Sequence, residues 1–291
     1  MIRIDPAQLD LREFIRPGDA IVMGQGTSEP LTLTEALVRQ RRELGGVRVF
    51  LGVMFSDTFD PAQCDGIELR GLGGVGTNRR LVKAGVLDVM TCHVSQVNEF
   101  IAGGEIGSDV ALVQVSPPDE QGRYSLGLAA DYTRAAVDKA RVVIAEMNHL
   151  VPQSLCDGAL VAGDIDVLIE TRRAPIQLPS APIGDLERRI AAHVDAYIPD
   201  RATLQVGYGS IPEAVIALPS AAKGGTLPKI VARLSGPVTT ARSDVDVVAT
   251  EHGAVRLRGM PLRHRVKAMI DLAAPQHREA LERQAHEIYR L

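Results

Sequence analysis

Tryptophan is absent from this 291-residue chain, and aromatic residues make up only 3% of it. Its core must therefore be aliphatic, which suits parallel sheets that are buried on both faces. The 32 basic residues are outnumbered by 36 acidic ones, which gives a formal net charge of -4. With no excess positive charge and few rings for base stacking, nucleic acid is not expected as a partner.

Two further absences bear on location and on metals. No run of about eighteen apolar residues is present, and charged residues interrupt the N-terminus where a secretion signal needs an apolar stretch. We therefore expect a cytoplasmic protein without a membrane segment. The three cysteines, Cys64, Cys92 and Cys156, form no CxxC pair, and the histidines show no HxxxH spacing. Neither a disulfide framework nor a metal site is expected.

Apolar runs of strand length alternate with helix-length segments along the first half of the chain. We predict strands at 20–23, 47–53, 86–90, 109–115, 142–145 and 166–169, and helices at 31–40, 78–84 and 132–139. Such alternation implies right-handed crossovers and a mostly parallel sheet. The predicted fold class is α/β, with open, mostly parallel sheets and flanking helices.

A proline-containing stretch at 171–182, without helical or alternating period, is the expected linker between domains at 1–180 and 183–291. The second domain opens with an amphipathic helix predicted over 183–197. After it we predict strands at 202–206, 230–232, 245–249 and 254–257, and helices at 212–218, 262–272 and 278–289. So few strands indicate a reduced domain.

Glycine-rich turns supply the first candidate binding residues. Gly24, Gln25 and Gly26 follow a predicted strand and precede a helix, where backbone amides can approach an anion. The turn reads GQGTSE rather than GxGxxG, which disfavours a Rossmann-type dinucleotide site. Spacing alone favours a purely structural turn over a binding turn.

Two other stretches are candidates for ligand contact. Lys223 stands beside Gly224 and Gly225, an arrangement that suits a phosphate or pyrophosphate. An exposed loop lysine is an equally good interpretation. Residues 116–122 turn the chain by proline and Asp-turn chemistry at the end of a predicted strand, which is where open α/β sheets bind ligands.

Longer stretches resemble the acetyl-CoA hydrolase/transferase family, the class I CoA-transferases of the 4-hydroxybutyrate and succinate type. The first half carries GQGTSEPLTLTEAL from Gly24, CHVSQV from Cys92, and the long run VSPPDEQGRYSLGLAADYTRAAVDKARVVIAEMN from Val115. The second half carries IGDLERRIAAHV, ATLQVGYGSIPEAV and VTTARSDVDVVATEHGAVRLRG. These stretches extend over nearly the whole chain.

The resemblance implies two tandem CoA-transferase-like domains that bind CoA or acyl-CoA at their interface and exchange CoA with a small carboxylate or water. CoA is then a substrate, and no further cofactor is expected. CoA contacts are implied for Gly24, Gln25, Gly26, Gly207, Gly209, Lys223, Gly224 and Gly225. A structural or ligand-orienting role is implied for Glu251. We also expect a homo-oligomer or a subunit of a larger complex.

The chain departs from the family pattern where the catalytic glutamate belongs. In the family, a glutamate of the second domain attacks the thioester carbonyl. Here Ile211–Val215 runs within a few residues into Leu218–Gly225, so a central block of the second domain is missing. No residue can be assigned as the nucleophile. The alternatives are a CoA-transferase or acetyl-CoA hydrolase homologue, a non-catalytic CoA-binding or interaction subunit, and a gene remnant.

Overall fold

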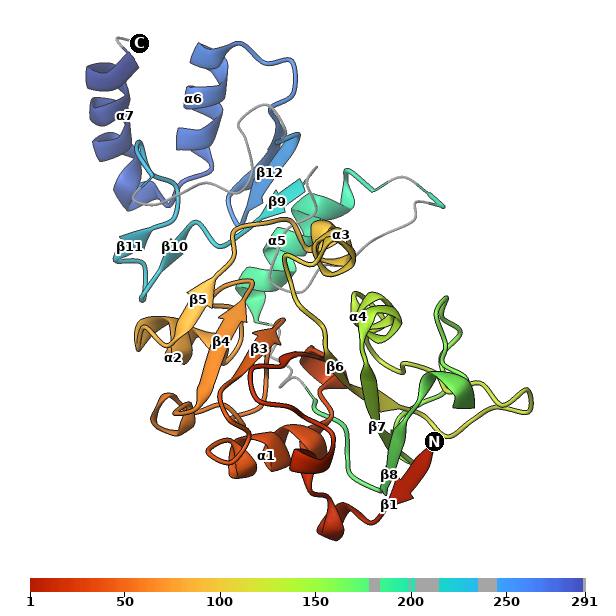
Figure 1. Cartoon of the computed structure of the whole chain (residues 1–291). Coiled ribbons are helices and arrows are strands. Elements are labelled where there is room, and N and C mark those ends of the chain that lie inside the picture. The colour runs from red at the N-terminus through yellow and green to blue at the C-terminus, as the bar shows by residue number, and fades with distance from the viewer. Residues whose placement is uncertain (178–183, 199, 202–214, 235–244, 290–291) are drawn as a thin grey trace. The chain divides into compact units, whose positions relative to one another are not determined.

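The computed structural model describes residues 1–177, 184–198, 200–201, 215–234 and 245–289 (Figure 1). The chain divides into two compact units, Met1–Pro179 (unit 1) and Ser180–Leu291 (unit 2). The predicted strand at 202–206 lies outside the described residues, as do residues 178–183 of the segment that joins the units. No helix in the described part of the chain is long and apolar enough to cross a membrane.

Unit 1 is built on an eight-stranded sheet in the order β1-β8-β7-β6-β2-β3-β4-β5. Every neighbouring pair of strands is parallel. This confirms the predicted α/β class. The strands are β1 (Ile2–Ile4), β2 (Ala20–Met23), β3 (Val47–Leu51), β4 (Ile67–Gly71), β5 (Leu87–Val89), β6 (Val110–Val115), β7 (Val142–Asn148) and β8 (Val167–Thr171).

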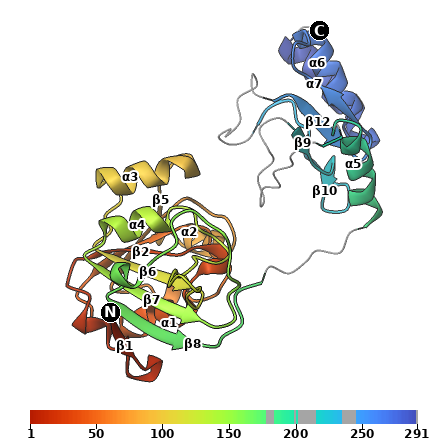
Figure 2. The same ribbon diagram turned by 90° about the vertical axis from the view of Figure 1, so that its right-hand side faces the viewer.

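Helices cover both faces of this sheet (Figure 2). The side chains of the strands alternate between two cores. Ile21 and Met23 of β2 join one core with α1 and α2, whereas Val22 joins the other core with α3 and α4. This is the period-two alternation of a strand buried on both faces. The helices are α1 (Leu31–Gln40), α2 (Asn78–Lys83), α3 (Val97–Gly103) and α4 (Thr133–Lys139).

Short 3₁₀ helices complete unit 1: η1 (Pro6–Gln8), η2 (Leu11–Glu13), η3 (Gly26–Ser28), η4 (Pro61–Gln63), η5 (Val94–Gln96) and η6 (Ala162–Asp164). The chain adds β3, β4 and β5 successively on one side of β2, and β6, β7 and β8 on the other. The direction in which successive strands are added to the sheet therefore reverses, and the boundary between β2 and β6 is the switch point. Open α/β sheets bind ligands beyond the carboxyl ends of the strands at such a switch point.

Unit 2 contains a three-stranded sheet in the order β13-β12-β9 and a two-stranded hairpin of β10 and β11. Its strands are β9 (Val215–Ala217), β10 (Ala221–Ala222), β11 (Leu227–Pro228), β12 (Val247–Thr250) and β13 (Gly253–Arg256). Its helices are α5 (Asp185–Asp195), α6 (Leu262–Asp271) and α7 (Pro275–Tyr289). A small core joins Ile230, Val248, Leu257, Leu272, Ala273 and Leu281.

Two sequence predictions in unit 2 are wrong. The helix expected at 212–218 is replaced, in its described part, by β9, which pairs in parallel with β12. Val215 and Ile216 are β-branched, and a neighbouring strand favours extended backbone for such residues. The strand expected at 230–232 is a bend, in which Ile230 is buried in the core but pairs with no strand.

Candidate functional site

The turn after β2 lies at the switch point of the unit 1 sheet, and it contains Gly24, Gln25 and Gly26. The Gly24 N–H donates to the Leu112 carbonyl at 3.0 Å, and the Gly26 N–H donates to the Val53 carbonyl at 2.7 Å. The fold therefore brings these three residues together at an edge suited to ligands. Both glycine amides are already bonded within the protein.

Gln25 joins two loops of this edge through its side-chain amide. Its Oε1 accepts a hydrogen bond from the Val53 N–H at 2.7 Å, and its Nε2 donates to the Asp131 carboxylate. Gly52 makes room for this contact, because a Cβ there would lie 2.0 Å from Gln25 Oε1. The Gln25 side chain thus fixes the spacing between the loops that follow β3 and precede α4.

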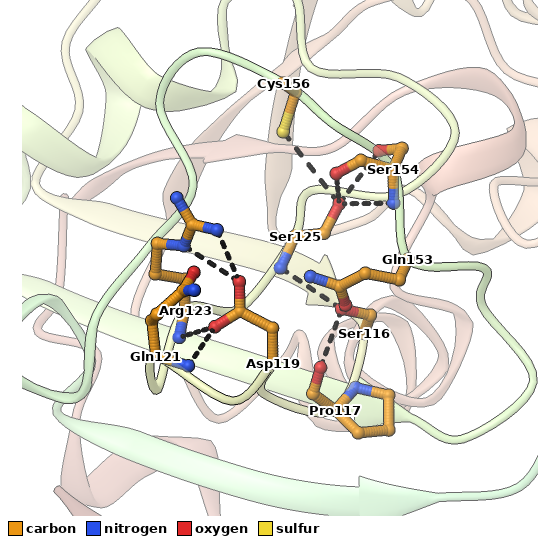
Figure 3. Close-up of polar contacts among 9 residues, drawn as sticks. All are labelled: Ser116, Pro117, Asp119, Gln121, Arg123, Ser125, Gln153, Ser154 and Cys156. Atoms are coloured by element: carbon orange, nitrogen blue, oxygen red, sulfur yellow. Dashed lines mark hydrogen bonds and ion pairs between the residues drawn. The ribbon is translucent and has the colours of Figure 1, made fainter.

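The loop after β6 is held by its own polar side chains (Figure 3). Asp119 accepts hydrogen bonds from the backbone N–H groups of Gln121 and Arg123 and from the Arg123 guanidinium. Ser116 donates to Gln153 Oε1 at 2.5 Å and accepts from the Ser125 N–H at 3.1 Å. This confirms the predicted Asp-turn chemistry. The Asp119 carboxylate serves the loop's own conformation, whereas the Ser116 hydroxyl also bonds to Gln153 of the loop between β7 and β8.

Ser125 extends the same network toward the loop between β7 and β8 (Figure 3). Its hydroxyl accepts from the Ser154 N–H at 3.2 Å and donates to the Ser154 carbonyl at 3.0 Å. Cys156 Sγ lies 3.8 Å from the Ser125 hydroxyl, and Cys156 is a free thiol like Cys64 and Cys92. The two loops at this end of the sheet are therefore linked by side chains.

Two buried glutamates bond to residues at the start of α1, and the sequence analysis did not single them out. Glu146 of β7 is fully buried, and it accepts hydrogen bonds from the Thr32 N–H at 2.8 Å and the Thr171 hydroxyl at 2.9 Å. Its carboxylate thereby caps the N-terminal end of α1. Burial raises the pKa of Glu146, and these hydrogen bonds offset only part of that rise.

Glu29 follows the turn itself and is 1% exposed. Its Oε1 accepts from the Thr34 hydroxyl at 2.9 Å, whereas its Oε2 is buried without a hydrogen-bond partner among the described residues. Desolvation raises the pKa of Glu29. The only sequence signal for the Glu29 carboxylate was its position next to a glycine turn. Its burial depends on the loops around it, which the sequence does not show.

The second predicted cluster is the tip of the β10–β11 hairpin in unit 2. Lys223, Gly224 and Gly225 all have positive φ, at 50°, 64° and 90°. The Gly225 N–H donates to the Ala222 carbonyl at 3.1 Å and closes the turn, which has the positive φ values of type I′. Lys223 is exposed, and its ammonium has no partner among the described side chains.

This hairpin tip is tethered to the start of α7. The Gln276 side-chain amide donates to the Gly225 carbonyl at 3.2 Å, and His277 Nε2 lies 2.8 Å from the same oxygen. The tip is therefore fixed beside the N-terminal end of a fifteen-residue helix. The peptide dipoles at such an end favour a negatively charged group.

Glu251 lies at the base of the same hairpin. Its Oε2 accepts from the Ser220 N–H at 2.8 Å and its Oε1 from the Ser220 hydroxyl at 2.5 Å. Its backbone carbonyl accepts from the Arg189 guanidinium at 2.6 Å. Desolvation alone would raise the pKa of Glu251, but the Ser220 hydrogen bonds outweigh it and hold that pKa below its usual value.

Gly207 and Gly209 lie outside the described residues, so their expected contacts stay predictions. Within the ranges that the structure describes, no group of three or more His, Cys, Asp or Glu residues could hold a metal ion. The candidate residues thus fall into two sets, the switch-point turn of unit 1 and the hairpin of unit 2.

Solved structures resemble this fold along nearly its full length. RipA from Yersinia pestis superposes with a TM-score of 0.88 at 20% identity, covering 100% of this chain and 98% of that one. A 4-hydroxybutyrate CoA-transferase from Porphyromonas gingivalis superposes with a TM-score of 0.76 at 22% identity, covering 98% and 97%. At sequence identities of 20–22%, this similarity shows a shared fold.

Curated relatives are similar in sequence over a shorter range. A 4-hydroxybutyrate coenzyme A transferase from Clostridium kluyveri is 33% identical over 199 residues, which are 67% of this chain and 46% of that protein. A succinyl-CoA:cyclohexane-1-carboxylate CoA transferase from Geobacter metallireducens is 26% identical over 202 residues, 69% and 46%. The chain spans about half the length of these curated relatives.

Family models match both units. The N-terminal domain of acetyl-CoA hydrolase/transferase matches residues 8–178, and the C-terminal domain matches residues 208–285. The short second match fits the reduced second domain that the sequence resemblance implies. The chain belongs to the acetyl-CoA hydrolase/transferase family.

Proposed function

We propose that this chain binds CoA or an acyl-CoA and that Lys223 contacts its phosphates. The observation that carries the proposal is the backbone of Lys223, whose φ of 50° is unusual for a residue with a side chain. Left-handed backbone costs a non-glycine residue roughly 1–2 kcal/mol. A lysine in a strained conformation that is exposed at a hairpin tip points to a function for its ammonium group.

The proposed reaction is transfer of CoA between an acyl-CoA and a small carboxylate, or hydrolysis of an acyl-CoA. Family membership and the names of the curated relatives, which are CoA transferases, support this substrate class. We further propose a cytoplasmic protein that forms a homo-oligomer or joins a larger complex. Light scattering of the purified chain tests that assembly.

A non-catalytic CoA-binding subunit is the second candidate, and Glu251 favours it. Glu251 matches a glutamate motif of the family, but both of its carboxylate oxygens are engaged by Ser220. Hydrogen bonds to both oxygens reduce the nucleophilicity of this carboxylate. No other residue is assigned as the nucleophile.

Mass spectrometry after incubation with acetyl-CoA separates the two candidates. A transferase that uses a glutamate accumulates a covalent glutamyl-CoA adduct when no acceptor carboxylate is present, whereas a hydrolase releases free CoA and acetate because water is its acceptor. CoA binding with neither an adduct nor release of CoA from acetyl-CoA supports the binding subunit. Failure of the chain to bind either CoA or acetyl-CoA contradicts both.

A further inference from the structure

The chain leaves the sheet of unit 1 through residues 171–173, which we call the exit segment. Thr171 ends β8, and the next residues lead toward unit 2. Side chains of unit 1 hold this segment at both ends. The Thr171 hydroxyl donates to Glu146 Oε1 at 2.9 Å, and the Arg173 guanidinium donates to both carboxylate oxygens of Glu35 in α1 at 2.7 Å. The exit segment is therefore fixed beyond the last pair of the strand.

Asn148 clasps the backbone of Arg173. It is the last residue of β7 and is 1% exposed. Its Nδ2 donates to the Arg173 carbonyl at 2.7 Å, and its Oδ1 accepts from the Arg173 N–H at 3.2 Å. The same amide donates to Gln114 Oε1 and accepts from the Leu150 N–H, both at 3.1 Å. A primary amide has two donor hydrogens and two acceptor lone pairs, so every hydrogen-bonding position of Asn148 is occupied.

Gln114 extends this connection to the switch-point turn. It lies in β6 and is 5% exposed. Its Nε2 donates to the carbonyl of Thr27, which lies in η3 directly after Gly26. A chain of hydrogen bonds thus joins Arg173, Asn148, Gln114 and Thr27. Because the two amide side chains are buried, a partner that is lost at one end is not readily replaced by water, and a shift at one end strains the bonds at the other.

We propose that Asn148 and Gln114 couple the exit segment to the switch-point turn, so that a displacement of the chain that leads to unit 2 alters the turn. Such coupling is reciprocal, and a ligand that orders the turn would also tighten the exit segment. Both amides act as positioning residues in this arrangement. The inference goes beyond the proposed function, because it gives the connection between the units an influence on the candidate site whatever ligand binds there.

Hydrogen exchange at single amides of the full chain tests this coupling without any ligand. The amide of residue 173 reports the exit segment, and the Ser28 amide, which donates to the Gln25 carbonyl at 2.9 Å, reports the turn. Arg173→Ala removes the partly exposed pair with Glu35 and keeps every backbone group. Arg172→Ala is the matched control, because it removes the same charge from the neighbouring, exposed position. Asn148→Ala breaks the clasp itself.

In Arg173→Ala, protection from exchange should fall about threefold at residue 173 and at Ser28, as expected for the loss of a partly exposed ion pair. In Asn148→Ala it should fall about tenfold or more at both amides, because buried groups lose their partners. Arg172→Ala should match the parent chain. The thermal unfolding midpoint reports folding, and Arg173→Ala decides the test if Asn148→Ala does not fold.

Two results would overturn the proposal. One is lower protection at residue 173 with unchanged protection at Ser28, which would show that the clasp serves only the exit segment. The other is an equal effect of Arg172→Ala and Arg173→Ala at Ser28, including no effect of either.

Discussion

Ser220 donates two hydrogen bonds to one carboxylate, from its backbone N–H to Glu251 Oε2 and from its hydroxyl to Glu251 Oε1 at 2.5 Å. Both residues are buried. Ser220 stands directly before β10 and its carbonyl accepts from the Lys229 N–H at 2.9 Å, so this pair secures the base of the hairpin that carries Lys223. We regard Glu251 as a positioning residue for that hairpin.

Replacing Ser220 with Ala should destabilise unit 2, because Glu251 Oε1 loses its hydroxyl donor while remaining buried. The expected cost is about 1–3 kcal/mol at pH 7, measured by urea unfolding. The pKa of Glu251 is lowered by folding, so its contribution is present above the ordinary glutamate pKa and is lost as pH falls through the lowered value. The difference between parent and variant should therefore shrink in acid. A pH-independent difference would contradict this explanation.

Replacing Lys223 with Asn should make the chain more stable and weaken its binding of CoA. Asn tolerates positive φ and Asn-Gly is the preferred pair for this class of turn, so the variant should be more stable by about 1 kcal/mol. Its CoA affinity should fall about tenfold or more, since a charged hydrogen bond contributes roughly 1.5–3 kcal/mol. Urea unfolding and calorimetry measure the two quantities. Lys229→Asn, at another exposed lysine of unit 2, is the control and should leave CoA affinity unchanged.

Replacing Glu29 with Gln should stabilise unit 1 at pH 8 and have little effect near pH 4.5. Folding raises the pKa of Glu29, so its stabilising contribution is complete below the unfolded pKa and is lost as pH rises through the folded pKa. Glutamine removes that loss because it does not ionise. Urea midpoints across this pH range provide the measurement.

Glu35→Gln is the matched control for Glu29→Gln. The hydrogen bond from Arg173 lowers the pKa of Glu35, so the neutral variant should lose stability at pH 8 instead. The same sign for both variants would show that the burial of Glu29 does not control the pH dependence.

Replacing Gln25 with Ala should loosen the switch-point edge of unit 1. The Val53 N–H and Asp131 each lose a partner, at an expected cost of about 1 kcal/mol. Hydrogen exchange should accelerate at the Val53 amide. Gln63→Ala removes an exposed glutamine of the same unit and should leave that exchange rate unchanged. Equal rates at Val53 in the parent chain and in Gln25→Ala would refute the bridging role of Gln25.

The local sequence pattern was sufficient to predict a helix or strand where the contacts of that segment with its neighbours in the fold favour the same structure. The helix over 31–40 and the strand over 20–23 have the predicted bounds. The strand is a short, uninterrupted apolar run, and the helix buries Leu33, Ala36 and Leu37 at the spacings of three and four that are typical of a helix. The strand at Val215–Ala217 was missed because its pairing partner, β12, lies about thirty residues away in sequence. Pattern within a short window cannot supply that partner.

The candidate residues could be chosen from the sequence, but their contacts could not. The glycine turn after a strand pointed to Gly24–Gly26, and the Lys-Gly-Gly triplet pointed to Lys223. The capping of α1 by Glu146 joins residues 114 positions apart in the sequence. The orphaned oxygen of Glu29 and the bridge made by Gln25 likewise depend on loops that only the fold brings together.

Calorimetric titration of the full chain with CoA is the most direct test of the proposed CoA binding through Lys223. We predict saturable binding at a single site, with adenosine 3′,5′-bisphosphate as a competitor and with affinity reduced about tenfold or more in Lys223→Asn. Absence of binding at millimolar CoA, or equal affinity in the parent chain and in Lys223→Asn, would contradict the assignment of Lys223 to the phosphates of CoA.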